Sequence, residues 1–388
     1  MANLRELFAS VRNTFSRGVQ QAPQDDDVDL SEPSIEASPT LEHQTPVHQR
    51  ESLYDMVREN KLDELKAAFD QDADMSTTNL LHHVRSPEMV DFLVGKGANI
   101  DEPYVQNGPK TAEERAMSDL VGGDLDGFTP LMFAASTANI PTITRLLEHG
   151  ADSTNALHCA VSVERQDEEA VARTMIAAGA GVDNGIVQFA TDHGAQTGTI
   201  KALLDGGADP NGMNPDYGRG EAGTALQIAA HKGRMDVADL LLDYGADQMV
   251  RNVNGDTALH AAYEHPAMAE LIISRSADPA ASVNATDKMG NTPLTRAASE
   301  GKSDTAWKLL EHGADPALAI RGDAWREAEL SQQSDISRTT ERQTAMNLVR
   351  SRAVEQEKQA LRQTVAEVEQ DQTPDVAEQP APRRRARL

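Results

Sequence analysis

Residues 127–152 read GFTPLMFAASTANIPTITRLLEHGAD and hold the two signatures that decide the fold. Gly127 suits a tight turn that needs a positive φ, and Thr129 can cap a helix by accepting a backbone N–H. Pro130 fits the first helical position, where no backbone N–H is required. A Leu-Leu pair then precedes Gly150, the residue type that most often follows a helix end in the left-handed conformation. The stretch therefore predicts a turn followed by two short helices.

Both signatures recur along the chain. The tail, two apolar residues followed by Gly-Ala-Asp or a close variant, ends at Asp74, Asn99, Asp152, Gly181, Asp209, Asp247, Asp278 and Asp315. The opening signature, Thr-Pro-Leu-His or a variant, recurs near Thr224, Gly255 and Gly290, with a degenerate copy at Asn155. A repeat of this length indicates a stack of small units, each of which packs on its neighbours.

These units resemble ankyrin repeats, whose pattern is a turn, a T-P-L-H-x-A-A helix and a second helix ending in L-L-x-x-G-A-D. The resemblance covers residues 50–317 and predicts an all-α ankyrin-repeat solenoid of about eight helix-turn-helix units. Residues 51–100 and 184–209 depart from it because they lack the Thr-Pro-Leu-His start.

Two insertions, 101–123 and 210–223, interrupt the period between a second helix and the next first helix. The resemblance places both on the side where the family projects its finger-like loops. Insertions in repeat proteins map to one face, often the binding face, although a longer surface loop also costs little entropy. We therefore expect either a part of the binding face or two tolerated loops.

The segments that flank the repeats differ in composition. Residues 1–18 carry apolar residues at spacings of three and four, which predicts a short amphipathic segment that docks on the body or serves as a targeting or partner-binding peptide. Residues 19–49 are rich in Pro, Ser, Gln and Asp, so we expect a disordered linker. Residues 318–370 predict a helical cap with Trp325 and a C-terminal helix, either solvated or in a short coiled coil. Residues 371–388 predict a disordered, Arg-ended tail.

The 388-residue chain is strongly acidic, since 36 Lys plus Arg stand against 62 Asp plus Glu, for a formal net charge of −26. That balance disfavours direct nucleic-acid binding, which depends on Lys and Arg neutralising phosphates. We expect no transmembrane segment and no secretory leader, because no long apolar run occurs. A single Cys suits a reducing compartment. These features predict a cytoplasmic protein, with secretion into a host-cell cytosol or nucleus without a signal peptide as the alternative.

No constellation of residues predicts an active site, and we expect no catalytic, metal-binding or cofactor-binding residues. Cys159 fits a small buried side chain better than a nucleophile. His82 and His83 are adjacent, so they point to different sides of a helix, which is poor geometry for a shared metal. His158 and His260 occupy the repeat's own His position, where the resemblance implies a hydrogen bond across neighbouring turns.

What remains is a binding surface. The resemblance implies that a protein partner docks on the finger tips and on exposed positions of the first helices. The candidate tips are Leu125, Asp126, Phe128, Gly220, Glu221, Gly223, Val253, Asn254, Asp256, Lys288, Met289 and Asn291. The candidate groove positions, which follow the Ala-Ala pairs, are Ser136, Thr137, His231, Lys232, Glu264, His265, Ser299 and Glu300. Phe128 is either a hot-spot anchor or packs under the 101–123 insertion.

The tail ends in Arg383, Arg384, Arg385 and Arg387, a candidate signal for nuclear import or secretion, with a solubilising or incidental tail as the alternative. A repeat array between a disordered N-terminus and such a tail resembles effectors that bacteria inject into host cells. We therefore expect a monomeric, non-enzymatic protein–protein interaction module whose partner no motif identifies. The alternatives are an enzyme with an unrecognised site in 101–123 or in the C-terminal helix, and a nuclear regulator that uses the arginines.

Overall fold

The computed structural model describes residues 47–72, 75–106, 115, 125–153, 155–161, 167–213, 223–330 and 336–371. These residues form helices and connecting loops, with no strand among them. The chain divides into two compact units, residues Met1–Ala261 (unit 1) and Ala262–Leu388 (unit 2). The segment 1–18 and the arginines of the tail lie outside the described residues. Within the described part, no helix is both long enough and apolar enough to span a membrane.

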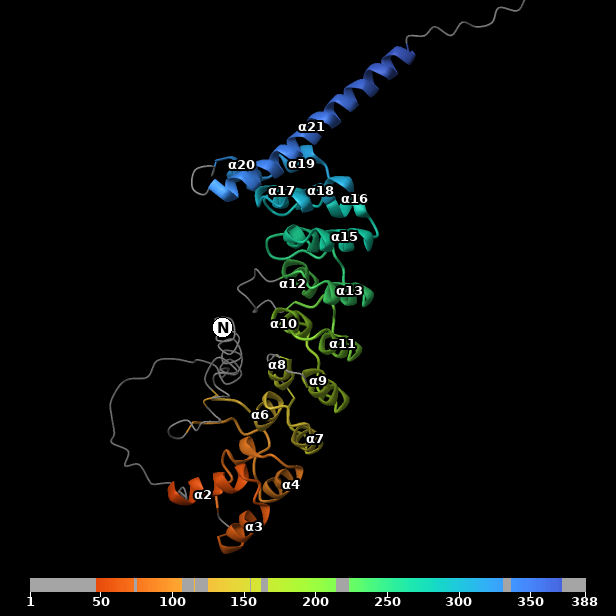
Figure 1. Ribbon diagram of the computed structural model, residues 1–388. Coiled ribbons are helices and arrows are strands. Elements are labelled where there is room, and N and C mark those ends of the chain that lie inside the picture. The colour runs from red at the N-terminus through yellow and green to blue at the C-terminus, as the bar shows by residue number, and fades with distance from the viewer. Residues whose placement is uncertain are drawn as a thin grey trace, which may run out of the picture. The chain divides into compact units, whose positions relative to one another are not determined.

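Unit 1 consists of short helices arranged in successive pairs (Figure 1). They are α2 (Val47–Arg58), α3 (Leu62–Gln71), η1 (Leu80–His83), α4 (Pro87–Gly95), α6 (Pro130–Ser136), α7 (Ile140–Glu148), α8 (Ala156–Val161), α9 (Glu168–Ala177), α10 (Ile186–Asp192), α11 (Thr197–Asp205), α12 (Ala225–Lys232), α13 (Met235–Asp243) and α14 (Ala258–Ala261). Helix α2 begins at Val47, inside the 19–49 segment that we expected to be a disordered linker. Leu53 and Val57 of this helix are buried, and their packing holds the helix in place.

The helix ends follow the local chemistry that the sequence predicts. The Thr129 hydroxyl accepts the Met132 N–H at 3.3 Å and Pro130 begins α6. Gly150, after α7, has a φ of +87°, in the left-handed region where residues with a Cβ are strained. The same Thr cap recurs at Thr224 before α12. The Thr residues therefore satisfy backbone N–H groups at the helix starts, and the left-handed Gly allows the chain to turn after the helix end.

The pairs stack in register. In Figure 1, α6, α8, α10 and α12 line one side of unit 1, and α7, α9, α11 and α13 line the other. The first helices pack on one another closely because their facing residues are small: Ala135, Ala160, Ala190, Ala229 and Ala230 are all buried. The Leu residues of the second helices, such as Leu146, Leu203 and Leu241, fill the space between the two rows.

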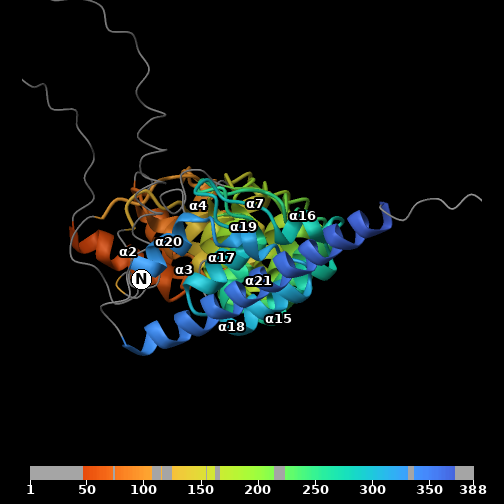
Figure 2. The same cartoon turned by 90° about the horizontal axis from the view of Figure 1, so that it is seen from above.

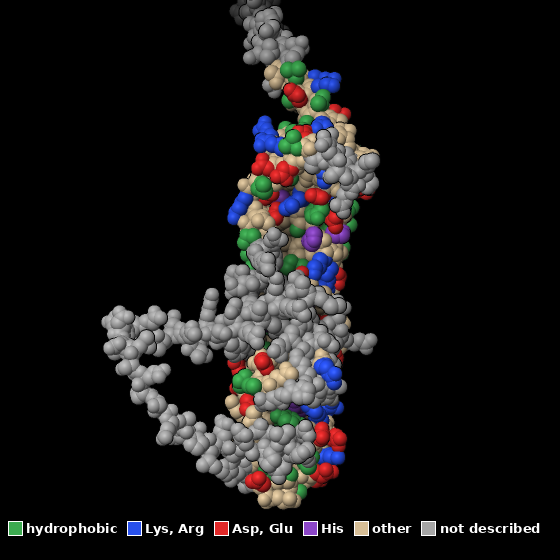
Figure 3. All heavy atoms as spheres, turned by 90° about the vertical axis from the view of Figure 1, so that its left-hand side faces the viewer, with side chains coloured by type: hydrophobic (Ala, Val, Ile, Leu, Met, Phe, Trp, Pro, Cys, Tyr) green, Lys and Arg blue, Asp and Glu red, His purple; other side chains and the backbone are tan. Residues whose placement is uncertain are grey.

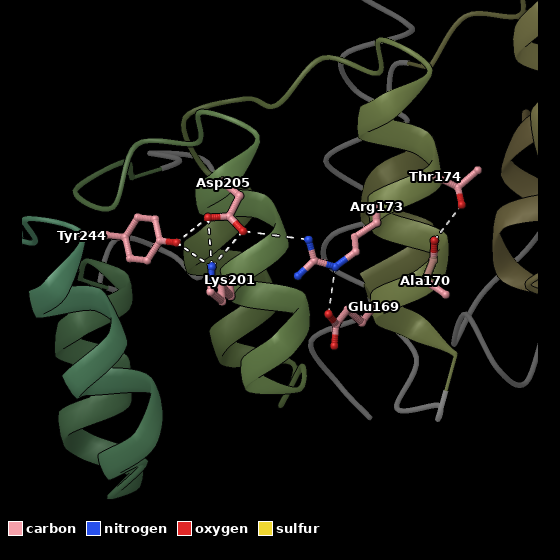
Figure 4. Close-up of polar contacts among 7 residues, drawn as sticks. All are labelled: Glu169, Ala170, Arg173, Thr174, Lys201, Asp205 and Tyr244. Carbon is pink, nitrogen blue, oxygen red and sulfur yellow. Dashed lines mark hydrogen bonds and ion pairs between the residues drawn. The ribbon is translucent and has the colours of Figure 1, made fainter.

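Polar contacts join the second helices on their exposed side (Figure 4). Arg173 of α9 lies 2.8 Å from Glu169 of its own helix and 3.9 Å from Asp205 of α11. Lys201 lies 2.9 Å from Asp205 and donates to the Tyr244 hydroxyl at 3.0 Å. The Tyr244 hydrogen bond, followed by that of Lys201, lowers the pKa of the Asp205 carboxyl. These solvent-exposed contacts orient neighbouring helix pairs within unit 1, and they contribute little to the free energy of unfolding.

Unit 2 contains η3 (Ala262–Glu264), α15 (Pro266–Ser274), α16 (Pro279–Val283), α17 (Pro293–Ser299), α18 (Ser303–Glu311), α19 (Pro316–Ala319), α20 (Asp323–Leu330) and α21 (Ile336–Asp371). Trp325 of α20 is buried, and its indole N–H donates to Glu329 at 2.9 Å. Arg350 of α21 stacks over the Trp325 ring at 5.5 Å. The first part of α21 packs on α17, α18 and α19. Helices α19, α20 and α21 therefore cover the apolar face that the last helix pair, α17 and α18, would otherwise expose.

Candidate functional site

We call the loop between a second helix and the next first helix a finger, and the finger between α13 and α14 is the regular example. Asn252 N–H donates to the Asp256 carbonyl at 3.0 Å, and Gly255 N–H donates to the Asn252 carbonyl at 2.9 Å. The Asn252 side-chain oxygen accepts the N–H groups of Asn254 and Asp256, both at 2.9 Å. Asn254 is therefore exposed at the tip, whereas Asp256 is buried at the base. The prediction that Asp256 is a contact residue is wrong, because its polar groups close the finger.

The finger before α17 in unit 2 has the same construction. Asp287 N–H donates to the Asn291 carbonyl at 2.9 Å, and the Asp287 carboxylate accepts the N–H of Met289 at 2.8 Å. Lys288 and Met289 project from its tip, where Met289 is 56% exposed. The two fingers thus share one pattern, in which a polar pair four positions apart holds two outward tip residues.

The finger before α6 closes with the same two backbone hydrogen bonds but with a longer sequence between them. Tyr104 N–H donates to the Phe128 carbonyl at 2.7 Å, and Gly127 N–H donates to the Tyr104 carbonyl at 2.9 Å. Tyr104 and Phe128 therefore occupy the positions of Asn252 and Asp256, although 24 positions separate them rather than 4. The insertion thus enters at the tip of this finger, and its residues 107–114 and 116–124 lie outside the described part.

This register separates the two alternatives given for Phe128 and contradicts the expected exposure of Leu125. Phe128 is only 3% exposed, and its ring packs edge-on against Phe133 at 5.9 Å, so it is not an exposed anchor. Leu125 is completely buried as well. An aromatic pair here replaces the polar pair of a regular finger, so packing of the buried rings takes the place of the side-chain hydrogen bonds, while the two backbone hydrogen bonds remain. Asp126 remains exposed and accepts the Gln106 N–H at 3.0 Å.

The fingers of unit 1 differ systematically in length. From the left-handed glycine after a second helix to the first residue of the next first helix, the regular connector runs 13 positions, from Gly245 to Ala258. Two connectors are longer, with 33 positions from Gly97 to Pro130 and 18 from Gly207 to Ala225. The two between them are short, with 6 positions from Gly150 to Ala156 and 7 from Gly179 to Ile186. The two long fingers therefore lie on either side of two helix pairs, α8–α9 and α10–α11, that have almost no finger.

Each long or regular finger of unit 1 exposes an apolar side chain. Val105 is 53% exposed, Met213 is 38% exposed and Val253 is 53% exposed. None of the turn hydrogen bonds requires an apolar residue at these positions. Sequence reasoning missed Val105 and Met213 because both lie within segments that it treated only as insertions. Val105 and Val253 directly follow the residues that close their finger bases, Tyr104 and Asn252, whereas Met213 is the last described residue before the 214–222 part of its connector. We call these three exposed side chains, Val105, Met213 and Val253, the apolar tips.

A side chain on three of the first helices supports the next finger. Gln227 donates to the Asp256 carbonyl at 2.8 Å, and Gln188 donates to the Gly223 carbonyl at 2.9 Å. His82 of η1 is hydrogen-bonded through Nε2 to the Phe128 carbonyl at 2.9 Å. Burial lowers the pKa of His82 to about 4, so the ring is neutral and Nε2–H is the donor. His82 thus occupies the repeat's His position. The sequence did not reveal this because residues 51–100 lack the Thr-Pro-Leu-His motif.

The other two histidines at this position behave differently. His158 Nε2 lies 3.4 Å from an Asp183 carboxylate oxygen in the following connector, an interaction across neighbouring turns as the resemblance implied. His260 Nδ1 accepts the Thr257 N–H at 3.1 Å and so caps its own helix. His260 therefore holds backbone of its own helix start, whereas His158 contacts a side chain of the following connector.

The groove candidates of unit 1 lie at the far end of the first helices from the fingers. Thr137, His231 and Lys232 are exposed. Lys232 forms an ion pair at 2.8 Å with Asp192, at the end of the preceding first helix. Ser136 is buried and donates to the Met132 carbonyl at 2.9 Å, so the prediction that it faces a partner is wrong. Eight residues of α12 place His231 and Lys232 about 12 Å from the finger.

In unit 2, Glu264 and Glu300 are exposed and His265 is half-buried. Glu264 pairs with Lys302 at 2.8 Å, which raises the pKa of that lysine. Ser299 is buried and donates to the Arg296 carbonyl at 3.0 Å, so it is unavailable to a partner. Figure 3 views the side of the first helices, where acidic, basic and His side chains of the described residues intermingle. That side therefore does not present one sign of charge.

The single thiol and the side chains that could bind a metal are the remaining candidates for reactive chemistry among the described residues. Burial raises the pKa of the Cys159 thiol to about 12, so the reactive thiolate is not formed near neutral pH. The described residues contain no group of three or more His, Cys, Asp or Glu side chains placed to hold a metal ion.

Comparison with known proteins agrees with this geometry. A family model of ankyrin repeats in three copies matches residues 187–282, and a single ankyrin-repeat model matches residues 126–156 and 289–320. This chain contains ankyrin repeats. The all-α ankyrin-repeat fold that the sequence predicts is confirmed. An ankyrin-repeat array is a scaffold for protein–protein interaction, and that coarse functional assignment holds for this chain.

Ankyrin-repeat relatives match parts of the chain. It is 34% identical over 105 residues to ankyrin repeat and SOCS box protein 16 of Mus musculus, covering 24% of this chain and 22% of that protein. It is 31% identical over 138 residues to ankyrin repeat and SAM domain-containing protein 6 of Danio rerio, covering 36% of this chain and 18% of that protein. The chain thus spans about a fifth of the length of these relatives.

Among solved structures, the chain is similar to the ankyrin repeat domain of Bcl-3, described as a unique member of the IkappaB protein family. The sequence identity is 26%, the TM-score is 0.41, and the match covers 50% of this chain and 89% of that chain.

Proposed function

We propose that this ankyrin-repeat protein binds a protein partner along the finger edge of unit 1 and that it does so without catalysis. The apolar tips carry the proposal. Connecting turns are normally built from Gly, Asn, Asp, Pro and Ser, whose hydrogen bonding and φ values suit a turn. Val105, Met213 and Val253 serve no such purpose and lose free energy by their exposure to water.

The arrangement of the tips supports a shared contact surface. Val105 and Met213 belong to the two long fingers, and two helix pairs with almost no finger, α8–α9 and α10–α11, lie between them. A partner that rests on α8 and α10 would meet one long finger on each side. Burying a Val or Met side chain fully is worth roughly 1.5–3 kcal/mol, so two or three such contacts supply a large share of a micromolar affinity.

The groove candidates have a secondary place in this proposal. Asp126 and Asn254 flank the apolar tips, so we keep them as rim contacts, and we keep Thr137, His231 and Lys232 as contacts for a partner that also reaches the far end of the first helices. Unit 2 offers a similar set in Glu264, His265, Lys288, Met289 and Glu300. Rim charges govern association rate and specificity more than affinity.

The experiment compares capture by wild-type protein with capture by a double variant, Val105→Asp and Val253→Asp. Proteins retained from a lysate are identified, and the dissociation constant of the retained protein is then measured with purified components. We expect the double variant to weaken binding by about thirtyfold or more, because each charge would have to be desolvated at the contact. The control is Met235→Asp, at an apolar residue that is 38% exposed but begins α13, away from the fingers.

Two results would count against the proposal. If the double variant binds as well as wild type while Met235→Asp binds weakly, the contact surface lies at the other end of the helix pairs. If every variant retains the same proteins equally, the retained proteins do not use the finger edge. Circular dichroism of each variant must match wild type, since Val105 and Val253 make few core contacts that a substitution could disturb.

A further inference from the structure

Helix α21 of unit 2 consists of two parts with different surroundings. Ala345, Met346 and Val349 are buried against the helix pairs of the unit. Farther along, Val354 is 48% exposed and Leu361 is 66% exposed. Figure 2 shows the C-terminal part of the helix running out past α16, away from the helices on which the first part packs. The second part therefore carries apolar side chains that unit 2 does not cover.

These apolar residues form a second stripe rather than a continuation of the first. At about 100° per residue, Val354 is rotated by about 140° from Val349 around the helix axis. Leu361 follows Val354 by one heptad and so lies on nearly the same side. The first stripe thus faces the body of unit 2, and the second stripe faces solvent. A polar helix with one exposed apolar stripe gains stability when that stripe is buried.

The spacing of the second stripe is that of a coiled coil. If Val354 and Leu361 are d positions, Lys358 is the one intervening a position. Taking Val354 as an a position instead would place Glu357 and Thr364 in the core. The first frame is therefore the one that places fewer polar side chains in the core.

We propose that residues 353–371 of α21 pair with the same segment of a second copy of this chain in a parallel coiled coil. In the chosen frame, Glu357 is a g position and Arg362 is the e position five residues later. A parallel homodimer brings g of one chain beside e of the other, so Glu357 faces Arg362 of the second copy on both sides of the pair. Lys358, the one charged core position, disfavours higher oligomers at a cost in stability.

This proposed pairing differs from the monomeric state that we expected from the sequence. It needs no contribution from the finger edge, so it stands independently of the proposed function. Two helices of this length form a weak dimer, and the pairing must therefore depend on protein concentration.

The first test measures the molar mass of the full chain by sedimentation equilibrium from about 1 to 100 µM. We expect the mass to rise from one chain to two. Leu361→Glu should raise the dissociation constant by about tenfold or more, because it puts a charge at a d position. Gln363→Glu, at the outward f position, should leave the dissociation constant unchanged. A chain that keeps the mass of one copy throughout, or a dimer that Leu361→Glu does not weaken, overturns the proposal.

The second test examines charge pairing and orientation. Glu357→Arg alone and Arg362→Glu alone should each weaken the dimer, and the two together should restore it. Val354→Cys should cross-link with itself under mild oxidation, because equal positions meet only in a parallel pair, and Cys159 is buried. Failure of the combined variant to recover, or absence of the cross-link in a sample that sediments as a dimer, rules out the parallel arrangement.

Discussion

His82 gives a quantitative test of how the long finger is held. The ring is 5% exposed, Nε2 is bonded to the Phe128 carbonyl, and Nδ1 has no hydrogen-bond partner. The Tyr104 and Phe133 rings pack edge-on against it at 5.4 and 5.2 Å. Protonating Nδ1 would place an unpaired charge in this apolar surrounding, which is why the pKa falls to about 4 in the folded chain.

The sign of the pH effect follows from that pKa. The unfolded chain binds a proton at His82 as pH falls below about 6.5, whereas the folded chain does not until about pH 4. Folding stability from this residue is therefore complete above about pH 6.5 and is lost progressively between about pH 6.5 and 4. The loss is about 2 kcal/mol at pH near 5 and about 3 kcal/mol at pH near 4, from roughly 1.4 kcal/mol per pKa unit.

The variant that isolates this effect is His82→Gln. Gln188 and Gln227 occupy the equivalent position and donate to the following finger, so glutamine keeps the donor and removes the titration. Urea unfolding of both proteins, followed by circular dichroism at about pH 7.5 and 5, yields the free energy of unfolding of each. Because both chains share the same carboxylates, the difference between the proteins removes their contribution. We expect the variant to gain about 2 kcal/mol relative to wild type on going to the lower pH.

An unchanged difference between the two proteins at the two pH values would refute the reasoning. It would mean that the His82 ring is solvated enough to take up a proton in the folded chain. The reciprocal change, Gln188→His, should introduce a similar acid sensitivity at a position that is 1% exposed.

Two further predictions concern the core and the tail. Thr199→Val should raise the free energy of unfolding by about 1 kcal/mol, or about 3 °C in melting temperature, because the buried Thr199 hydroxyl at the third position of α11 has no hydrogen-bond partner. Thr191→Val is the control and should destabilise instead, since its buried hydroxyl donates to the Val187 carbonyl at 2.7 Å; a gain in both variants contradicts the argument. Deleting residues 382–388 should leave the melting temperature unchanged in a thermal scan, because the segment is polar and basic. If the arginines are a nuclear-import or secretion signal, that deletion should abolish nuclear entry or export in a localisation assay, and unchanged localisation would exclude the signal.

The candidate site was partly predictable. Exposed residues at the tips, such as Asn254, Lys288 and Met289, follow from the repeat pattern, because a two-residue tip always points outward from its closing hydrogen bonds. Phe128 and Leu125 do not follow from it. The burial of Phe128 depends on Tyr104, His82 and Phe133, which are separated in sequence and meet only when two helix pairs stack.

Local sequence signals were enough to predict the helix pairs and their ends, because a Thr cap, a Pro at the first position and a left-handed Gly act on neighbours within about four residues. Which of the candidate side chains are exposed depends instead on tertiary packing. Burial at a finger base depends on which residues close the finger, and the insertion hid that pairing by placing 24 positions between Tyr104 and Phe128. The same holds for α21, where one amphipathic sequence carries two apolar stripes and only packing on unit 2 reveals that the second, at Val354 and Leu361, is uncovered.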